Sequence, residues 1–173
     1  MKTHTQKTNK KNFLPTLYFA YGANTNVEGM AYRCPNAEPI KTAKLKDWQL
    51  VFRGVADVIP CNGDVVTGVL WRITERCEKS LDRFEGFPTL YVKRYVKVSI
   101  DGQQYRVMFY VMRSRSYTSL PSACYLNTIL EGYDHFQIDR ACVHNALERV
   151  TADIQDDLNG IDWMDNEFEA SCH

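Results

Sequence analysis

Clustered metal ligands are missing from this chain of 173 residues, and histidine is scarce. The six cysteines include no Cys-x-x-Cys pair, and there are only four histidines. Structural zinc sites need such clusters, so we expect no metal. A nucleophilic cysteine would need a basic partner. We expect none, because His4 and His173 lie near the chain ends and His144 lies off the apolar stripe of its expected helix.

Other common signatures are absent as well. There is no Gly-x-x-x-x-Gly-Lys phosphate loop and no dinucleotide fingerprint, so we expect no cofactor. No window reaches the ~18 apolar residues of a membrane span, and no apolar stretch near the start has the form of a secretory signal. The formal net charge is zero, which gives the fold no general attraction to nucleic acid or to a membrane. Together with the unpaired cysteines, these absences predict a cytoplasmic protein with reduced thiols.

Charge is instead divided between the two ends. Lysines stand at positions 2, 7, 10 and 11, and no acidic residue precedes Glu28; after Arg149 there are seven acidic residues and no Lys or Arg. We predict a disordered basic tail (1–12), one domain (13–160) and an acidic C-terminal tail (161–173). A basic arm that touches nucleic acid or an acidic partner is the alternative for the first tail. The domain itself is expected to be a monomer or a homodimer.

The middle of the chain is rich in strand patterns and its end is helical. Asn62-Gly63 and Asp101-Gly102 each lie between alternating apolar runs, which predicts two β-hairpins. From Asp139 an apolar stripe at helical spacing predicts a long helix that ends near Gly160. Several antiparallel strands followed by helices indicate an α+β domain, in which helices pack outside a curled sheet or small mixed β-barrel.

Residues 17–34 contain the first candidate site. A buried strand over residues 17–21 is predicted to stop at Gly22, and a helical pattern begins at Val27. A glycine at a strand-to-helix turn lets backbone N–H groups converge, and the helix N-terminus adds partial positive charge, which suits a small carboxylate or an oxyanion. The alternative is a plain helix cap formed by Asn24 or Asn26.

Residues 74–91 contain the second candidate. Thr74 can cap a short helix whose apolar face is Cys77, Leu81 and Phe84, and a following glycine and proline stop it. Glu85 therefore falls at the helix C-terminus in a partly apolar setting. Both effects should raise the pKa of its carboxyl group, which suits a general base near neutral pH. The alternative is a solvated glutamate at a helix end.

Together the two segments resemble the gamma-glutamylcyclotransferase family, which includes the plant AIG2-like proteins. The family pattern is an aromatic strand with Tyr-Gly-Ser-Asn-Leu, then Leu-Asp-x-x-Glu-Gly and a later tyrosine; here these are YFAYGANT (18–25), LDRFEG (81–86) and Tyr91. The resemblance extends over residues 17–133 and implies a small mixed barrel. In the known reaction of this family, the α-amine of the substrate attacks the γ-carbonyl group of the same molecule. The reaction releases 5-oxoproline and an amino acid or amine.

By this resemblance Glu85 would be the catalytic base, and no metal or cofactor would be needed. A loop over residues 18–23 would offer backbone N–H groups to the substrate carboxylate or oxyanion, and Tyr91 could support Glu85 by hydrogen bonding. Two strand residues, Tyr18 and Phe19, are also expected in the core. The substrate-binding set implied for the small gamma-glutamyl ligand is Tyr18, Phe19, Ala20, Tyr21, Gly22, Ala23, Asn24, Tyr91 and Tyr125.

Two positions depart from the family pattern. Ala23 replaces the usual serine and Thr25 the usual leucine, whereas Asn24 is retained. The alternatives to an enzyme are therefore a catalytically degenerate member that binds a small ligand, and a protein-interaction module. Retention of Glu85 favours the enzyme. The leaving group stays open among an α-amino acid, an ε-amine, a polyamine and glutathione.

Overall fold

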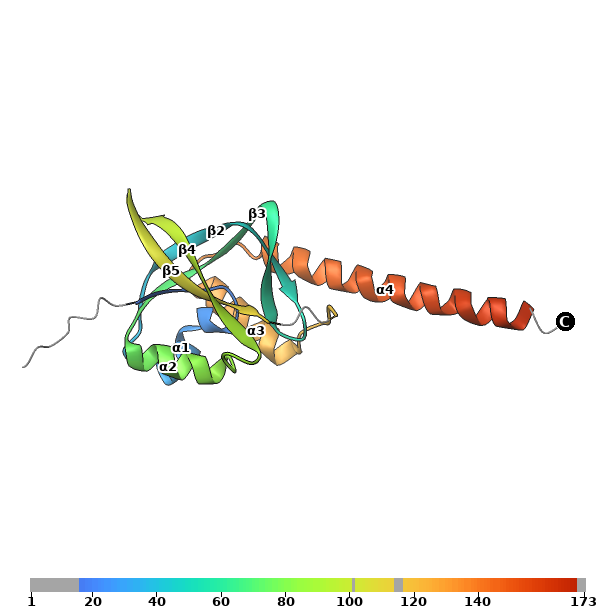
Figure 1. The fold of residues 1–173 in the computed structure, drawn as a ribbon, viewed down its shortest axis with the longest axis horizontal. Coiled ribbons are helices and arrows are strands. Elements are labelled where there is room, and N and C mark those ends of the chain that lie inside the picture. Colours follow the sequence, from blue (N-terminus) through green and yellow to red (C-terminus); the bar gives the residue numbers. More distant parts are fainter. Residues whose placement is uncertain (1–15, 101, 114–116, 171–173) are drawn as a thin grey trace, which may run out of the picture.

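The computed structural model describes residues 16–100, 102–113 and 117–170. It contains one five-stranded sheet with helices packed around it (Figure 1). The strands, in the order in which they pair, are β2 (Glu38–Phe52), β3 (Ala56–Ile73), β1 (Thr16–Ala20), β5 (Gln103–Met112) and β4 (Tyr91–Ile100). β1 pairs in parallel with β5, and the other neighbours are antiparallel. The predicted α+β class is confirmed.

The word barrel is too strong for this sheet, because β2 and β4 are edge strands that do not pair with each other. The sheet is curled, and Trp48 on β2 packs edge-on against Phe109 on β5 with ring centres 5.1 Å apart. A cavity of about 640 Å³ lies between residues 41–47 of β2 and residues 96–100 of β4. The strands curve towards each other but leave this gap, so the sheet stays open.

One of the two predicted hairpins is wrong. Asn62-Gly63 lies inside β3, and the chain turns between β2 and β3 at residues 53–55. Lys46 pairs with Val65 but Trp48 pairs with Pro60, so several β3 residues bulge out opposite Asp47. Gly63 has a φ of 87° and donates its N–H to the Asp47 carboxylate at 3.0 Å. The glycine therefore serves a bulge, which requires the same left-handed backbone as a tight turn.

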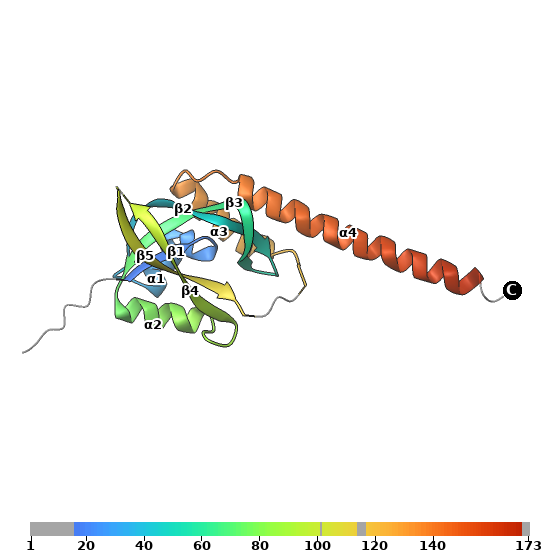
Figure 2. The same cartoon turned by 45° about the horizontal axis from the view of Figure 1, so that its top comes forward.

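The second hairpin is confirmed, because β4 and β5 pair from Tyr91 with Met112 up to Ile100 with Gln103. The last helix, α4 (Ala141–Ala170), runs past the predicted end near Gly160. Its apolar stripe packs on the domain as far as Val150, whereas Ile154 and Leu158 are exposed. Figures 1 and 2 show the remainder of α4 extending away from the sheet. The predicted tail over residues 1–12 lies outside the described residues, and the domain boundaries stay a prediction.

Three shorter helices surround the end of β1. They are α1 (Val27–Arg33), α2 (Glu75–Phe84) and α3 (Ala123–His135), and a 3-10 turn, η1 (Ala23–Thr25), joins β1 to α1. α3 rests directly on η1, because a Cβ atom at Gly132 would lie only 2.4 Å from the Thr25 hydroxyl. The Tyr133 hydroxyl lies 3.1 Å from the Tyr21 carbonyl oxygen, to which it donates a hydrogen bond. α3 thus packs against the turn after β1 and holds it in place. None of the helices in the described ranges is both long and apolar enough to cross a membrane.

Candidate active site

Glu85 is the residue that caps the C-terminus of α2, and its side chain points into the protein. The helix begins as expected, with the Thr74 side chain accepting a hydrogen bond from the Cys77 N–H at 3.2 Å. Cys77 and Leu81 are buried, but Phe84, expected on the same face, is 49% exposed. The Glu85 carboxylate accepts a hydrogen bond of 2.8 Å from the side-chain amide of Asn24. Glu85 is therefore not the solvated residue of the alternative interpretation.

The surroundings of Glu85 shift its titration towards neutral pH. Burial raises the pKa of its carboxyl group to about 7, while the nearby Arg33 charge and the Asn24 hydrogen bond lower it in part. Burial dominates because the charged form loses water that one amide cannot replace. A carboxyl group with a pKa near 7 is present both as acid and as base at neutral pH. It can therefore take up a proton and release it within one reaction cycle.

A cavity of about 40 Å³ lies beside Glu85. It is narrow and rich in tyrosine. Its walls are formed by residues of the strands β1, β3, β4 and β5 and of the helices α2 and α3 or the ends of these elements. Its lining residues are Tyr18, Tyr21, Gly22, Ala23, Asn24, Ala56, Phe84, Glu85, Tyr91, Tyr110 and Tyr125.

Most of the residues expected at the site are brought together here, but two are not. Phe19 and Ala20 are buried and do not line the cavity. Side chains alternate along a strand, so Phe19 lies on the opposite face of β1 from Tyr18. Ala20 lies against β3, where a Cβ atom at Gly68 would come within 2.2 Å of its carbonyl oxygen. These two residues belong to the core.

Three lining residues were missed from the sequence: Ala56, Phe84 and Tyr110. Tyr110 was not considered as a site residue, and simple alternation along β5 would place it on the face opposite Val107 and Phe109. In the structure both faces of this part of β5 are covered, and Tyr110 is 2% exposed. Phe84 was assigned to the packed face of α2. Ala56 follows the turn between β2 and β3, where no sequence motif indicated a functional site.

The two candidate asparagines divide the roles that were alternatives in the sequence. Asn26 caps α1, and its side chain accepts a hydrogen bond from the Gly29 N–H at 2.8 Å. Asn24 instead faces the cavity, where its amide nitrogen donates to the Tyr18 hydroxyl at 3.0 Å as well as to Glu85. The amide oxygen of Asn24 is buried and has no hydrogen-bond partner in the described part of the chain. A buried acceptor of this kind is unusual and is suited to a donor brought by a ligand.

Two cavity tyrosines hold Ala56. Tyr91 donates to the Ala56 carbonyl oxygen at 2.8 Å, and the Tyr125 hydroxyl oxygen accepts from the Ala56 N–H at 3.0 Å. The expectation was that the Tyr91 hydroxyl supports Glu85 by a hydrogen bond. In the structure this hydroxyl donates to Ala56 instead. The Ala23 N–H also acts on the Tyr125 hydroxyl: burial raises the pKa of Tyr125, and the N–H groups of Ala56 and Ala23 oppose this shift. The turn after Gly22 thus places a backbone N–H group near enough to the Tyr125 hydroxyl to lower its pKa.

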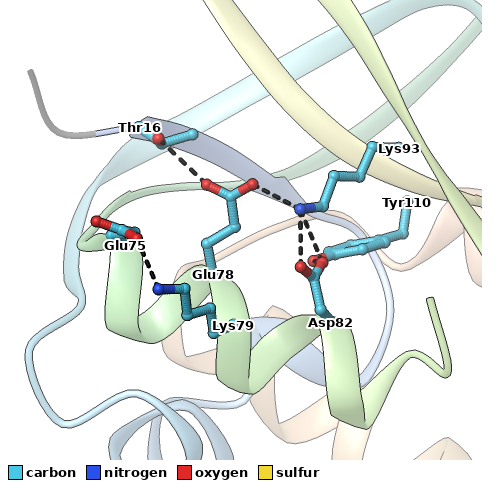
Figure 3. Close-up of polar contacts among 7 residues, drawn as sticks. All are labelled: Thr16, Glu75, Glu78, Lys79, Asp82, Lys93 and Tyr110. Carbon is cyan, nitrogen blue, oxygen red and sulfur yellow. Dashed lines mark hydrogen bonds and ion pairs between the residues drawn. The ribbon is translucent and has the colours of Figure 1, made fainter. Parts of the chain in front are cut away.

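A partly buried ion cluster anchors α2, the helix that ends at Glu85 (Figure 3). Lys93 on β4 lies 2.6 Å from a Glu78 carboxylate oxygen and 2.8 Å from an Asp82 oxygen, and its side chain is only 13% exposed. Burial opposes the charge of Lys93, but its bonds to Asp82 and Glu78 hold its pKa above the ordinary value. Asp82 also accepts a hydrogen bond of 2.6 Å from the hydroxyl of Tyr110, which lines the cavity. The cluster thus fixes α2 and Tyr110 relative to each other.

Cys34 and the grouping of possible metal ligands are two further features of the structure. Burial raises the pKa of the Cys34 thiol to about 12, which keeps it protonated and weakly nucleophilic. Across the described ranges, no three His, Cys, Asp or Glu side chains gather in a way that could hold a metal ion.

Comparison with known proteins extends this picture. Residues 18–127 match the model of the family described as "Gamma-glutamyl cyclotransferase, AIG2-like". The mouse gamma-glutamylcyclotransferase is 33% identical over 130 residues, which cover 67% of this chain and 69% of that protein. The human gamma-glutamylcyclotransferase is 34% identical over 119 residues, which cover 61% of this chain and 62% of that protein. The matches thus span about two thirds of these relatives.

Solved structures agree. One described as a gamma-glutamyl cyclotransferase aligns with a TM-score of 0.66 and 28% identity, covering 79% of this chain and 86% of that one. The Bacillus subtilis protein YkqA has a TM-score of 0.67 and 23% identity, covering 82% of this chain and 56% of its own, and shows the shared fold alone. The motif segments, the sheet that brings them together and the match over more than half of the residues lead to one conclusion. This chain belongs to the gamma-glutamyl cyclotransferase, AIG2-like family.

Proposed function

We propose that this protein is a gamma-glutamylcyclotransferase, which cleaves a gamma-glutamyl amide by intramolecular cyclisation. The observation that carries the proposal is the environment of Glu85, a partly buried carboxyl group whose pKa is raised to about 7. The carboxyl group is held by Asn24 at the edge of a cavity. A protein that only binds ligands or partners gains nothing from a partly buried carboxyl group of this kind, which costs stability.

The residues present can support each step of the reaction. Glu85 accepts a proton from the substrate α-ammonium group, and the free amine attacks the γ-carbonyl carbon of the same molecule. The new bond from nitrogen to the γ-carbon closes the five-membered ring, and the bond from that carbon to the leaving nitrogen breaks. The proton held by Glu85 passes to the leaving nitrogen, and the second proton that the ring nitrogen loses follows by the same route, so that the products are 5-oxoproline and a protonated amine.

Asn24 and the turn before it would hold the substrate for this attack. The unpartnered amide oxygen of Asn24 can accept an N–H from the substrate amine. The N–H at Ala23 can serve the carbonyl oxygen if that oxygen takes the place of the Tyr125 hydroxyl. Since nucleophile and electrophile belong to one molecule, holding it in a folded shape supplies much of the rate. Ala23 provides its backbone here, so the loss of the family's serine hydroxyl leaves this contact intact.

The size of the cavity favours a second candidate, a degenerate member that binds a small ligand without turnover. Its volume of about 40 Å³ is close to that of one water molecule, about 30 Å³ in the liquid. A glutamyl group therefore needs a lining side chain to move. Phe84 is suited to this, because it is 49% exposed and ends a helix.

The deciding experiment incubates the full chain with a panel of gamma-glutamyl compounds and measures 5-oxoproline. The panel covers amino acids, an ε-linked lysine, a polyamine conjugate and glutathione. The enzyme should release 5-oxoproline from at least one, and Glu85→Gln should lower turnover by roughly 10²-fold or more. Glu38→Gln, an exposed glutamate paired with Arg72, is the matched control and should keep full activity. Binding without 5-oxoproline from any compound would favour the degenerate member.

A further inference from the structure

Arg33 links the Glu85 cavity to a second, larger cavity. The carbon at the centre of its guanidinium group lies 3.9 Å from the centre of the Phe84 ring. Phe84 lines the Glu85 cavity, whereas Arg33 lines a cavity of about 390 Å³ between α1 and α2. The stacked pair thus belongs to the walls of both cavities. A molecule that displaces or passes the Phe84 ring would enter the second one.

The second cavity, which we call the basic cavity, carries only positive charge. Arg33, Arg76, Lys79 and Arg83 line it, and none of its lining residues is Asp or Glu. Lys79 is paired with Glu75 at 2.6 Å. The three arginines form no ion pair with any acidic residue in the described part of the chain. Three guanidinium groups therefore share a hollow that has no acidic residue in its lining, although the charge of Arg33 also acts on Glu85 in the neighbouring cavity.

Of the three acidic residues of α2, Glu75 is paired with Lys79, and the other two do not reach this cavity. Glu78 and Asp82 point to the other side of the helix, where both contact Lys93 (Figure 3). The helix therefore directs Glu78 and Asp82 towards Lys93, whereas its two arginines line the basic cavity. This arrangement leaves Arg76 and Arg83 without an acidic partner on their own helix in the described part of the chain.

Arg33 gives a second indication of a missing ligand. Its Nη1 atom is buried and has no hydrogen-bond partner in the part of the chain that the structure describes. The atom is confined next to α1, since a Cβ atom at Gly29 would lie 2.7 Å from it. A buried cationic N–H without an acceptor is costly, and an anionic group would satisfy it. Such a group can reach Arg33 when the Phe84 ring moves.

We infer that the basic cavity binds the leaving part of the substrate, and that it selects gamma-glutamyl conjugates whose leaving part carries more than one carboxylate. An acidic amino acid or an acidic dipeptide has this chemistry. The inference rests on the proposed function, because it places the scissile amide beside Glu85 and the leaving part beyond Phe84. Arg76 and Arg83 are two helical turns apart, about 10 Å along α2, so two carboxylates can be bound at once. Planar guanidinium groups match carboxylates by paired hydrogen bonds, whereas a polyamine would be repelled.

The test compares kcat/KM for 5-oxoproline release from four conjugates of the gamma-glutamyl group: with glutamate, alanine, alaninamide and putrescine. Efficiency should fall in that order. In the double variant Arg76→Gln/Arg83→Gln the ratio of the glutamate to the alaninamide conjugate should fall by about tenfold or more, mainly through KM. Arg106→Gln is the matched control, because this arginine lies over Tyr95 on the β4–β5 hairpin and lines neither cavity. That control should keep the wild-type ratio.

Failure of the inference can be told apart from failure of the proposed function. Equal efficiency for all four conjugates, a preference for putrescine, or an unchanged ratio in the double variant would overturn the inference while the enzyme stands. If no conjugate releases 5-oxoproline, calorimetric binding to the Glu85→Gln protein decides. The same order of affinity, lost in the triple variant with Arg76→Gln and Arg83→Gln, would support an acidic ligand. Equal affinity for all four conjugates would contradict the inference.

Discussion

Asn24 and Glu85, which are 61 residues apart in the chain, meet through a hydrogen bond of 2.8 Å. Asn24 stands in the turn after β1, and Glu85 ends α2. The same amide group of Asn24 also holds the Tyr18 hydroxyl. One asparagine therefore holds the carboxyl group to which we assign the chemistry, and it lowers in part the pKa that burial raises.

The rate of 5-oxoproline release should rise with pH. The base must be ionised to accept a proton, so kcat/KM should increase through an apparent pKa of about 7 and then level off. The hydrogen bond from Asn24 lowers this pKa, so Asn24→Ala should move the rising limb to higher pH. A pH profile of each protein checks this. A limb that stays in place in the Asn24 variant would show that another group controls the rate.

Glu85 should make folding stability depend on pH in an unusual direction. Its pKa in the folded protein, about 7, lies above the ordinary value of 4.5, so the folded state favours the protonated form. Stability from this group is complete below pH 4.5 and is lost as pH rises through 7. Glu85→Gln, which is always neutral, should therefore be more stable than wild type at pH 8, by on the order of 2 kcal/mol. Urea unfolding at pH 5 and pH 8 checks this, and an equal difference at both values would contradict it.

Lys93 should matter far more than its neighbour Lys79. Lys93→Met leaves Glu78 and Asp82 without their partner in a partly buried place, and should cost about 3 kcal/mol or more of stability. Lys79→Met removes a pair in which both side chains are more than half exposed, and should cost less than about 1 kcal/mol. Thermal unfolding of both proteins checks the contrast. Similar losses in the two variants would mean that the cluster does not anchor α2.

Gly132 is where α3 approaches the turn after β1. A Cβ atom there would lie 2.5 Å from a Thr25 backbone carbon and 2.7 Å from the Asn26 nitrogen, so the backbones must separate. Gly132→Ala should destabilise the protein by about 1–3 kcal/mol and displace Tyr125 from the cavity. Unfolding measurements and the KM of the variant check the two effects. As a comparison, Gly102→Ala meets no atom within 4 Å but has a φ of 81°, so it tests backbone strain without crowding.

The parts of the site that could be predicted from the sequence are those with local signals. Thr74, Glu85 and the stop after it follow the start and end rules of one short helix, and Gly22 ends a strand. Tyr110 could not be found in this way. Its role depends on a second covered face of β5, and alternation within one strand does not reveal what packs on it. Phe84 shows the opposite error, because helical spacing places it on the buried face while the neighbouring α1 leaves it half exposed.

The fold shows the same limit. The β4–β5 hairpin was predicted because alternating apolar runs flank Asp101-Gly102 in the sequence, and the pairing of the two strands confirms it. Asn62-Gly63 carries an equally good turn signal, yet it serves a bulge within β3. Only pairing with β2 distinguishes the two uses, and that pairing is set by the earlier turn at Gly54. Tyr91 likewise binds Ala56, on β3, and not the glutamate near it in sequence.

Several contacts that close the Glu85 cavity join distant parts of the chain. Asn24 meets Glu85, and Tyr125 meets Ala56 across 69 residues. During folding, the helices and the β4–β5 hairpin can form through contacts between residues that are close in the sequence. The cavity forms only when the distant segments also come together. A molecule that has gained its secondary structure but not these contacts would have no cavity. The appearance of the Asn24–Glu85 contact would therefore time the last stage of folding more sharply than any measure of helix or strand content.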